Sequence, residues 1–146
     1  MKNTVTILRN LLPLLAELGI RPEEIGFDTL EARLHAETSA LTAIGNDLGF
    51  EELFARQIEA LGKEGDVAIA ITTSGKSANV TRALRQAKAM GIVPAALTGK
   101  GGGELVGLAS PILIVPSDTT ARIQEMHITL GQMLCGAVEI ELGLAR

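Results

Sequence analysis

Residues 67–77 read VAIAITTSGKS, a run of five apolar residues that passes directly into a loop of hydroxyl-bearing residues. An unbroken apolar run of this length is typical of a strand that is covered on both faces of a sheet. The next residues, 78–90, carry apolar side chains at the helical period with charged residues between them. This stretch therefore predicts a buried strand, a polar loop and a helix in immediate succession.

The same alternation extends in both directions along the chain. The sequence predicts further strands at 92–97 and 112–115, and further helices at 50–61, 104–109 and about 119–142. Strands that alternate with helices give a parallel sheet with helices on both of its faces. We predict an α/β domain, a three-layer αβα sandwich around a parallel sheet of about four strands.

The N-terminal region is harder to assign to this sheet. Residues 4–18 place apolar residues at the helical period, which predicts a helix, and a second helix start follows at 21–24. Residues 31–37 fit a short strand as well as a helix. We therefore expect a single domain over 1–146, with an N-terminal helical segment at 1–30 and an α/β core at 31–146. If no strand precedes 67–71 in the sheet, its exposed edge must be covered by residues 1–30 or by a partner chain.

Composition excludes several classes of function. The chain has 146 residues, a net charge of −4 and a pI near 5.2, so it has no general positive field for nucleic acid or anionic lipid. Without Trp or Tyr, and with three Phe, it can hardly stack on bases or sugars. A single cysteine, Cys135, permits no internal disulfide and no zinc–cysteine cluster. No apolar run reaches the roughly 18 residues of a membrane span, and no signal-peptide pattern is present. We predict a cytoplasmic protein with neither a nucleic-acid nor a membrane partner.

The loop at 72–77 has the composition of an anion site. Its hydroxyls belong to Thr72, Thr73, Ser74 and Ser77. They precede a helix, where backbone N–H groups and the positive end of the helix dipole point outward. Gly75 lets the backbone approach a ligand closely, and Lys76 adds a cation. The pattern predicts phosphate or another anion as the ligand. In the alternative interpretation, Ser77 is only an N-cap and the other hydroxyls form a local turn.

A nucleotide-binding P-loop is a remote alternative. Residues 70–77, AITTSGKS, nearly match that motif, with Ala70 in place of its first glycine. However, Ala70 is expected within the strand. The predicted strand at 112–115 also does not end in an aspartate that could help to hold magnesium.

Five short motifs follow one another along the chain. They are TSALTAIGND at 38–47, FARQ at 54–57, the loop at 72–77, LTGK at 97–100 and ARIQEMH at 121–127. Together they resemble the sugar isomerase (SIS) domain of the phosphoheptose isomerase family, over roughly residues 37–142. The resemblance implies an αβα sandwich, a sugar phosphate ligand, and a homodimer or homotetramer with sites between subunits. It also implies isomerisation of sedoheptulose 7-phosphate to a heptose 7-phosphate.

The resemblance implies roles for individual residues. The family's phosphate loop matches Thr72, Thr73, Ser74, Gly75 and Ser77, its substrate-binding Asn-Asp pair matches Asn46 and Asp47, and its Gln that reaches substrate and metal matches Gln124. Gln124 is thereby the candidate metal ligand, and zinc is the cofactor to consider.

Two parts of the family pattern are missing. Residues 1–36 hold neither the family's Cys-Gly-Asn-Gly-Gly-Ser turn nor the helix whose His and Glu serve metal binding and proton transfer. Two turns after Gln124, where the family has a catalytic, metal-binding His, this chain has Gln132. A neutral amide cannot shuttle a proton near pH 7, and it is a poor zinc ligand beside imidazole.

Two neighbours of Gln124 are candidates for the missing acid–base role. His127 lies close to the same helical stripe as Gln124, and it is otherwise a packed or hydrogen-bonded residue. Glu125 could act as a base if burial raised its pKa, and it is otherwise a solvated or interface residue.

Three further features have competing interpretations. His35 and Glu37 could form an acid–base pair only if they lie on a strand. The glycine-rich residues 100–103 are a second candidate anion contact, or a flexible turn or lid. Cys135 is expected to be a core residue rather than a nucleophile.

Three functions remain open at this point. The chain is a phosphoheptose isomerase-like enzyme whose acid–base groups are not located, a catalytically silent phosphosugar-binding module, or an oligomeric adaptor. A branch of the family acts as an adaptor for the bacterial replication initiator, and that branch also lacks the second-turn His. The missing His and Glu argue against turnover.

Overall fold

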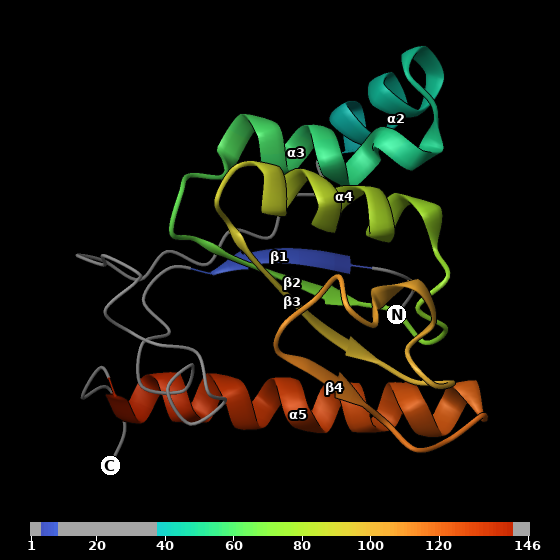
Figure 1. The fold of residues 1–146 in the computed structure, drawn as a ribbon, viewed down its shortest axis with the longest axis vertical. Coiled ribbons are helices and arrows are strands. Elements are labelled where there is room, and N and C mark those ends of the chain that lie inside the picture. The colour runs from blue at the N-terminus through green and yellow to red at the C-terminus, as the bar shows by residue number, and fades with distance from the viewer. Residues whose placement is uncertain (1–3, 9–37, 142–146) are drawn as a thin grey trace.

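The structure, a computed structural model, describes residues 4–8 and 38–141 (Figure 1). Its elements are β1 (Thr4–Leu8), α2 (Thr38–Asp47), the 3-10 helix η2 (Phe50–Glu52), α3 (Leu53–Leu61), β2 (Val67–Ile71), α4 (Ala78–Ala89), β3 (Val93–Thr98), the 3-10 helix η3 (Gly103–Leu105), β4 (Ile112–Ile114) and α5 (Thr120–Glu141). The strands and helices predicted from residue 50 onward are present within a few residues, except that a single 3-10 turn replaces the helix predicted at 104–109.

The four strands form one sheet in the order β1-β2-β3-β4. Strands β2, β3 and β4 are parallel, with Ile69 opposite Ala95 and Leu97 opposite Leu113. Strand β1 runs antiparallel to β2. The α/β sandwich is therefore confirmed, but the sheet is mixed rather than wholly parallel.

Strand β1 corrects the prediction of a helix over 4–18. Thr4–Leu8 pairs with β2 along all five residues, from Thr4 opposite Ile71 to Leu8 opposite Val67. The apolar residues of TVTIL fit the spacing of a helix as well as that of a strand. The N–H and C=O groups along the edge of β2 need partners, and this favours a strand. The expected cover of this edge is thus supplied by the N-terminal region itself. The rest of the predicted helical segment at 1–30, and residues 31–37, lie outside the described residues.

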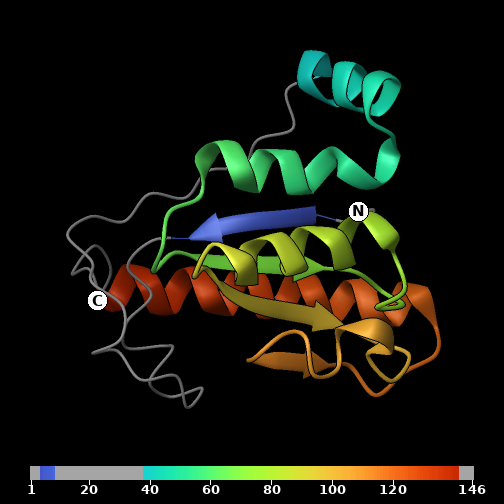
Figure 2. The same cartoon turned by 45° about the horizontal axis from the view of Figure 1, so that its top comes forward.

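Alternate residues of β2 face two different helix layers. Ala68 and Ala70 pack in one buried cluster, whose other members include Ile58 of α3, and Val80, Ala83, Leu84 and Ala87 of α4. Val67 and Ile69 pack in a second cluster, against Leu130, Leu134 and Val138 of α5. Helices α3 and α4 therefore cover one face of the sheet, and α5 covers the other (Figures 1 and 2).

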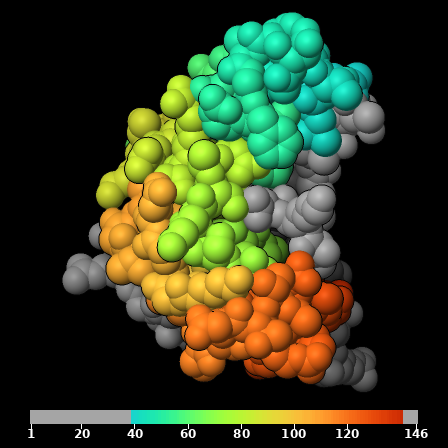
Figure 3. Space-filling model, turned by 90° about the vertical axis from the view of Figure 1, so that its right-hand side faces the viewer, coloured from blue at the N-terminus to red at the C-terminus, as the bar shows by residue number. Residues whose placement is uncertain are grey.

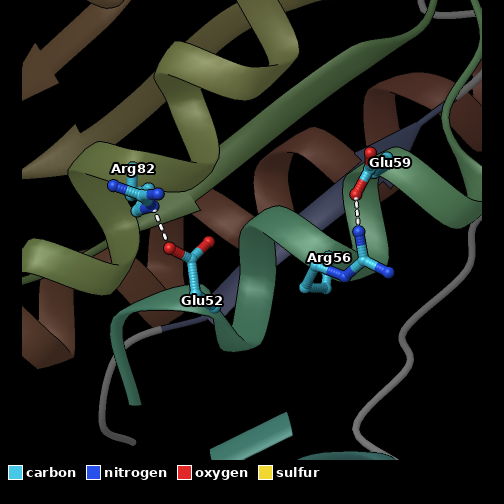
Figure 4. A network of polar contacts seen from close by, with 4 residues as sticks. All are labelled: Glu52, Arg56, Glu59 and Arg82. Carbon is cyan, nitrogen blue, oxygen red and sulfur yellow. Dashed lines mark hydrogen bonds and ion pairs between the residues drawn. The ribbon is translucent and has the colours of Figure 1, made fainter. Parts of the chain in front are cut away.

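Helix α2 lies on the outer side of this structure, against η2 and α3 and away from the sheet (Figure 2). An ion pair between Glu52 of η2 and Arg82 of α4 joins this layer to the helix that follows the Ser/Thr loop (Figure 4). Arg56 and Glu59 pair within α3, where both side chains are half-exposed, so this second pair adds little stability.

Among the helices of the described ranges, none combines the length and the apolarity that a membrane crossing requires.

Candidate functional site

The loop at 72–77 lies between the carboxyl end of β2 and the first turn of α4, as the sequence predicts. The Thr72 N–H donates to the carbonyl of Leu97, 3.1 Å away, which extends the ladder between β2 and β3 by one residue. Ser77 occupies the N-cap position, and the N–H groups of Val80 and Thr81 each donate to its carbonyl at 3.0 Å. The loop therefore starts from a rigid strand and ends on a rigid helix.

The hydroxyls of this loop make contacts that bear on both of its interpretations. Ser77 makes no side-chain cap of α4, and its Oγ instead lies 3.3 Å from Oγ1 of Thr72. Ser74 does form a local turn, since its Oγ accepts the N–H of Lys76 at 3.3 Å. The N–H groups of Val80 and Thr81 donate to the Ser77 carbonyl, so the N–H groups of Ala78 and Asn79, at the very start of α4, are those without a side-chain cap. The arrangement leaves room for an anion at the start of α4, which a side-chain cap would have occupied.

The loop after β3 contacts the loop at 72–77 and fixes its conformation. Gly75 has φ +63°, and a Cβ at this position would lie only 1.9 Å from the carbonyl oxygen of Gly102. The N–H of Glu104 donates to the carbonyl of Gly75 at 2.9 Å. Figure 3 faces this edge of the sheet and shows the green chain after β2 beside the orange-yellow chain after β3. Gly102 and Gly103 therefore serve close backbone packing, not a lid.

Positive charge is present on the same loops. The side chains of Lys76 and Lys100 are both exposed. Lys100 has a positive φ of 50°, and its N–H donates to the carbonyl of Ser117, 3.3 Å away, in the loop after β4. Hydrogen bonds thus connect all three loops that follow the parallel strands.

His127 is buried below the end of β3. Its side chain is 3% exposed, and the ring is hydrogen-bonded to the backbone of Thr98. Burial lowers the pKa of His127 from the ordinary value of 6.5, and the hydrogen bond to Thr98 only partly offsets this effect. Nε2 has no hydrogen-bond partner in the described part of the chain, and it is closed to solvent. A neutral ring with one free lone pair is held under the site rather than at its surface.

The other two α5 candidates differ in exposure. Gln124 is half-buried, one turn before His127. Glu125 is exposed and forms an ion pair with Arg122 at 2.7 Å. Burial, the condition for a Glu125 base, is not met within this chain.

Asn46 and Asp47 end helix α2, and both are exposed. The side-chain amide of Asn46 donates to Asp47 Oδ1 at 2.8 Å. Neither residue is hydrogen-bonded to the loop at 72–77, and α2 lies on the far side of α3 (Figure 2). A single copy of the chain does not bring this pair together with the Ser/Thr loop.

The described residues of this one chain do not form a group that fits a zinc ion. Across 38–141 and 4–8, no three His, Cys, Asp or Glu side chains come together as a metal site. Gln124 and Gln132 offer amides, and Gln132 is exposed. Cys135 is exposed as well, so its prediction as a core residue is wrong. The possible partners His35 and Glu37 lie outside the described residues.

The P-loop alternative loses support because Ala70 is fully buried within β2, paired with Ala96 of β3. A P-loop needs a flexible glycine at that place to wrap around the phosphates.

The fold is an α/β sandwich, with the hydroxyl-rich loop at 72–77 at the carboxyl ends of its parallel strands. Residues 25–99 match the model of the SIS domain family, which is just over half of the chain. The chain belongs to this family.

Relatives of known name are similar over most of the chain. It is 56% identical over 126 residues to the phosphoheptose isomerase of Paramagnetospirillum magneticum, covering 86% of this chain and 66% of the relative. It is also 56% identical over 106 residues to phosphoheptose isomerase 1 of Campylobacter jejuni, covering 73% of this chain and 57% of the relative. The chain thus spans between 57% and 66% of the length of these two relatives.

Solved structures agree with the fold. The phosphoheptose isomerase of Neisseria gonorrhoeae superposes with a TM-score of 0.69 at 46% identity, over 71% of this chain and 58% of that one. A phosphoheptose isomerase from Francisella tularensis gives a TM-score of 0.69 at 39% identity, with the same coverage of 71% and 58%.

Proposed function

We propose that this chain binds a sugar phosphate, with the phosphate held by the loop at 72–77. The observation that carries this proposal is the uncapped N-terminus of α4 behind the hydroxyls of Thr72 and Ser77, 3.3 Å apart. The names of the relatives, phosphoheptose isomerases, support a phosphorylated sugar as the ligand.

The physical basis of binding is charge. A phosphate monoester is an anion with several acceptor oxygens, and hydroxyl and N–H donors remain protonated across the physiological pH range. The α4 dipole and the exposed Lys76 add positive potential at the same place. The sugar itself is left to groups outside this loop.

We propose sedoheptulose 7-phosphate as the sugar, and its isomerisation as the reaction of the complete site. Moving a proton between neighbouring carbons needs an acid and a base. Glu125 is exposed and ion-paired, and His127 is buried, so neither is placed for this role within one copy. A second subunit is therefore part of the proposal, as a homodimer or homotetramer in the cytoplasm. The exposure of Asn46 and Asp47, away from their own chain's loop, supports a site completed between subunits.

The alternative is a catalytically silent phosphosugar sensor or an oligomeric adaptor. The amide at Gln132, and the lack of a three-residue metal group in the described chain, are the observations that support this alternative.

Calorimetric titration with sedoheptulose 7-phosphate, with and without zinc, tests the proposal when the same samples are assayed for heptose 7-phosphate. Sedoheptulose without its phosphate is the matched control ligand. Binding of the phosphorylated sugar alone supports the phosphate site, and product formation identifies an enzyme. Binding without product identifies a sensor. Equal affinity for both ligands, or no binding, removes the loop as the phosphate site.

A further inference from the structure

Two residues of α5, one helical turn apart, contact the end of β3. Ile123 is fully buried, and a Cβ at Gly99 would lie only 2.4 Å from its Cδ1. His127 is 3% exposed, and its ring is hydrogen-bonded to the backbone of Thr98. Residues four apart lie on the same face of a helix, so this face of α5 packs against the point where β3 passes into its loop.

The contacts of His127 define which ring nitrogen carries the proton. Nε2 has no partner in the described part of the chain and is closed to solvent, so Nδ1 is the nitrogen bonded to Thr98. Burial lowers the pKa of His127, and the bond to Thr98 acts in the opposite direction, as a ring N–H that donates to a carbonyl oxygen does. In the neutral ring, Nδ1 therefore holds the proton and the carbonyl of Thr98 accepts it in a hydrogen bond.

The carbonyl of Thr98 joins three elements of the fold. It also accepts the N–H of Val115, directly after β4, at 2.8 Å. A carbonyl oxygen has two lone pairs, so it can accept from α5 and from the segment after β4 together. Thr98 itself is fully buried. The position of the end of β3 thus depends on these two hydrogen bonds, of which His127 supplies one.

The segment after Thr98 is short and leads directly to the loop at 72–77. Only four residues separate Thr98 from Gly103. Gly103 has no room for a side chain, because its Cβ would lie 2.7 Å from the carbonyl oxygen of Gly75. The N–H of Glu104 donates to that same carbonyl at 2.9 Å. A displacement of Thr98 would therefore also displace the contact that fixes the loop at 72–77.

The unpartnered Nε2 indicates that His127 does more than fill space. A buried acceptor without a donor costs free energy, and an apolar side chain of similar size would avoid that cost. An apolar side chain, however, cannot donate to the carbonyl of Thr98. The hydrogen bond to Thr98 is what the imidazole ring supplies at this place.

We propose that His127 is a positioning residue for the loop at 72–77, acting through Thr98 and the loop after β3. In this role the ring needs no contact with the ligand. The inference rests on the proposed function only for what the loop at 72–77 binds. Its effect on the two loops is independent of any ligand and can be measured without one.

The ring tautomer tests the hydrogen bond in the unaltered protein. In a nitrogen-15-labelled chain at about pH 8, where the ring is neutral, long-range proton–nitrogen spectra should show His127 with a protonated Nδ1 and a bare Nε2. His35→Gln assigns the signals, because His35 is the chain's other histidine. A bare Nδ1 overturns the proposal, since it has no proton to donate to Thr98. This measurement decides the matter even if substitution of His127 prevents folding.

Three variants separate positioning from general stability. His127→Leu removes the donor, whereas His127→Asn keeps one, because the Asn amide nitrogen can take the place of Nδ1. Ile58→Ala is the matched control. Ile58 is 1% exposed, but it lies in α3, on the opposite face of the sheet from α5. Its truncation lowers stability without touching the end of β3.

Amide hydrogen exchange reports the contact between the loops. The N–H of Glu104 is compared with that of Val93, which donates to the carbonyl of Asp66 at the other end of β3. In His127→Leu, protection at Glu104 relative to Val93 should fall about tenfold or more, and His127→Asn should retain most of it. Ile58→Ala should lower protection at both amides together. An unchanged ratio in His127→Leu, or the same fall in His127→Asn, overturns the proposal.

Calorimetry with sedoheptulose 7-phosphate relates the loop contact to ligand binding. His127→Leu should bind about fivefold or more weakly, and His127→Asn and Ile58→Ala should bind nearly as the parent does. Equal affinity in His127→Leu and the parent overturns the positioning role and leaves the phosphate site standing. A parent that binds no sugar phosphate removes the proposed function, and the exchange ratio then decides alone whether His127 fixes the two loops.

Discussion

The backbone N–H of Glu104 donates a hydrogen bond of 2.9 Å to the carbonyl of Gly75, and so joins the loop after β3 to the loop after β2. The two loops are close enough that Gly75 has no room for a side chain. The conformation of the candidate phosphate loop thus depends on a segment that follows it by some 30 residues.

Gly75→Ala should destabilise the protein and weaken phosphate binding. The new Cβ would lie 1.9 Å from the carbonyl oxygen of Gly102, so the two loops must separate. We expect a loss of about 2 kcal/mol or more in the free energy of unfolding, measured by urea denaturation. Gly101→Ala is the control, because Gly101 also has a positive φ, +76°, but nothing within 4 Å of its Cβ position. Equal losses in the two variants would show that backbone strain, not contact between the loops, is responsible.

Ser74→Ala should weaken sugar phosphate binding by roughly 1–3 kcal/mol, the usual cost of removing one partner of a charged hydrogen bond. Calorimetry would measure the change in affinity. Thr129→Ala removes an exposed hydroxyl from α5, far along the chain from the loop, and should leave the affinity unchanged. Unchanged affinity in Ser74→Ala would exclude that hydroxyl from the phosphate site.

His127 should make the protein less stable in acid. Its pKa is lowered by burial in the folded state, so the unfolded chain binds this proton more readily. The contribution of neutral His127 is therefore fully present above the unfolded pKa of about 6.5, and it is lost as the pH falls below that value toward the folded pKa. His127→Gln should reduce the drop in unfolding free energy between about pH 7.5 and pH 5. His35→Gln changes the chain's other histidine and serves as the control. An unchanged pH profile in His127→Gln would contradict the assignment.

Thr6→Pro should expose the edge of β2. Thr6 pairs with Ile69 at the middle of β1, and proline, with its fixed φ and no N–H, fits the interior of a strand poorly. We expect lower stability and concentration-dependent aggregation, followed by light scattering and thermal melting. Lys2→Pro, which precedes the strand, should behave like the parent. A monodisperse Thr6→Pro variant with the parent's melting temperature would show that β1 does not protect this edge.

The parts of the fold that could be predicted have local signals. Strand β2 and the loop at 72–77 stand out because an apolar run ends abruptly in hydroxyl residues. Strand β1 could not be predicted, since the apolar residues of TVTIL fit a helix and a strand equally well. Only pairing with β2 makes this segment a strand. Cys135 was misplaced because α5 has apolar residues around most of its circumference, which leaves no clear buried side.

Local sequence signals also explain why only one segment of the candidate site could be located from the sequence. The loop proposed to hold phosphate is one continuous segment, so its place between β2 and α4 could be predicted from composition and position alone. Its support by Gly102 and Gly103 is a contact between distant segments, for which three consecutive glycines were the only signal. The exposure of Asn46 and Asp47 depends on where α2 packs, and no local pattern contains that information.

The antiparallel direction of β1 determines where a fluorescent label should be attached to detect binding at the loop at 72–77. Thr4 lies opposite Ile71, the residue directly before Thr72, so the beginning of β1 lies at the edge of the sheet where the phosphate loop starts. A fluorescent dye attached through Thr4→Cys, in a Cys135→Ser background, would therefore be close to the loop proposed to bind the phosphate. The same dye attached through Leu8→Cys, at the other end of β1, would lie beside Val67 at the start of β2, far from this loop. It would report only changes in the whole molecule.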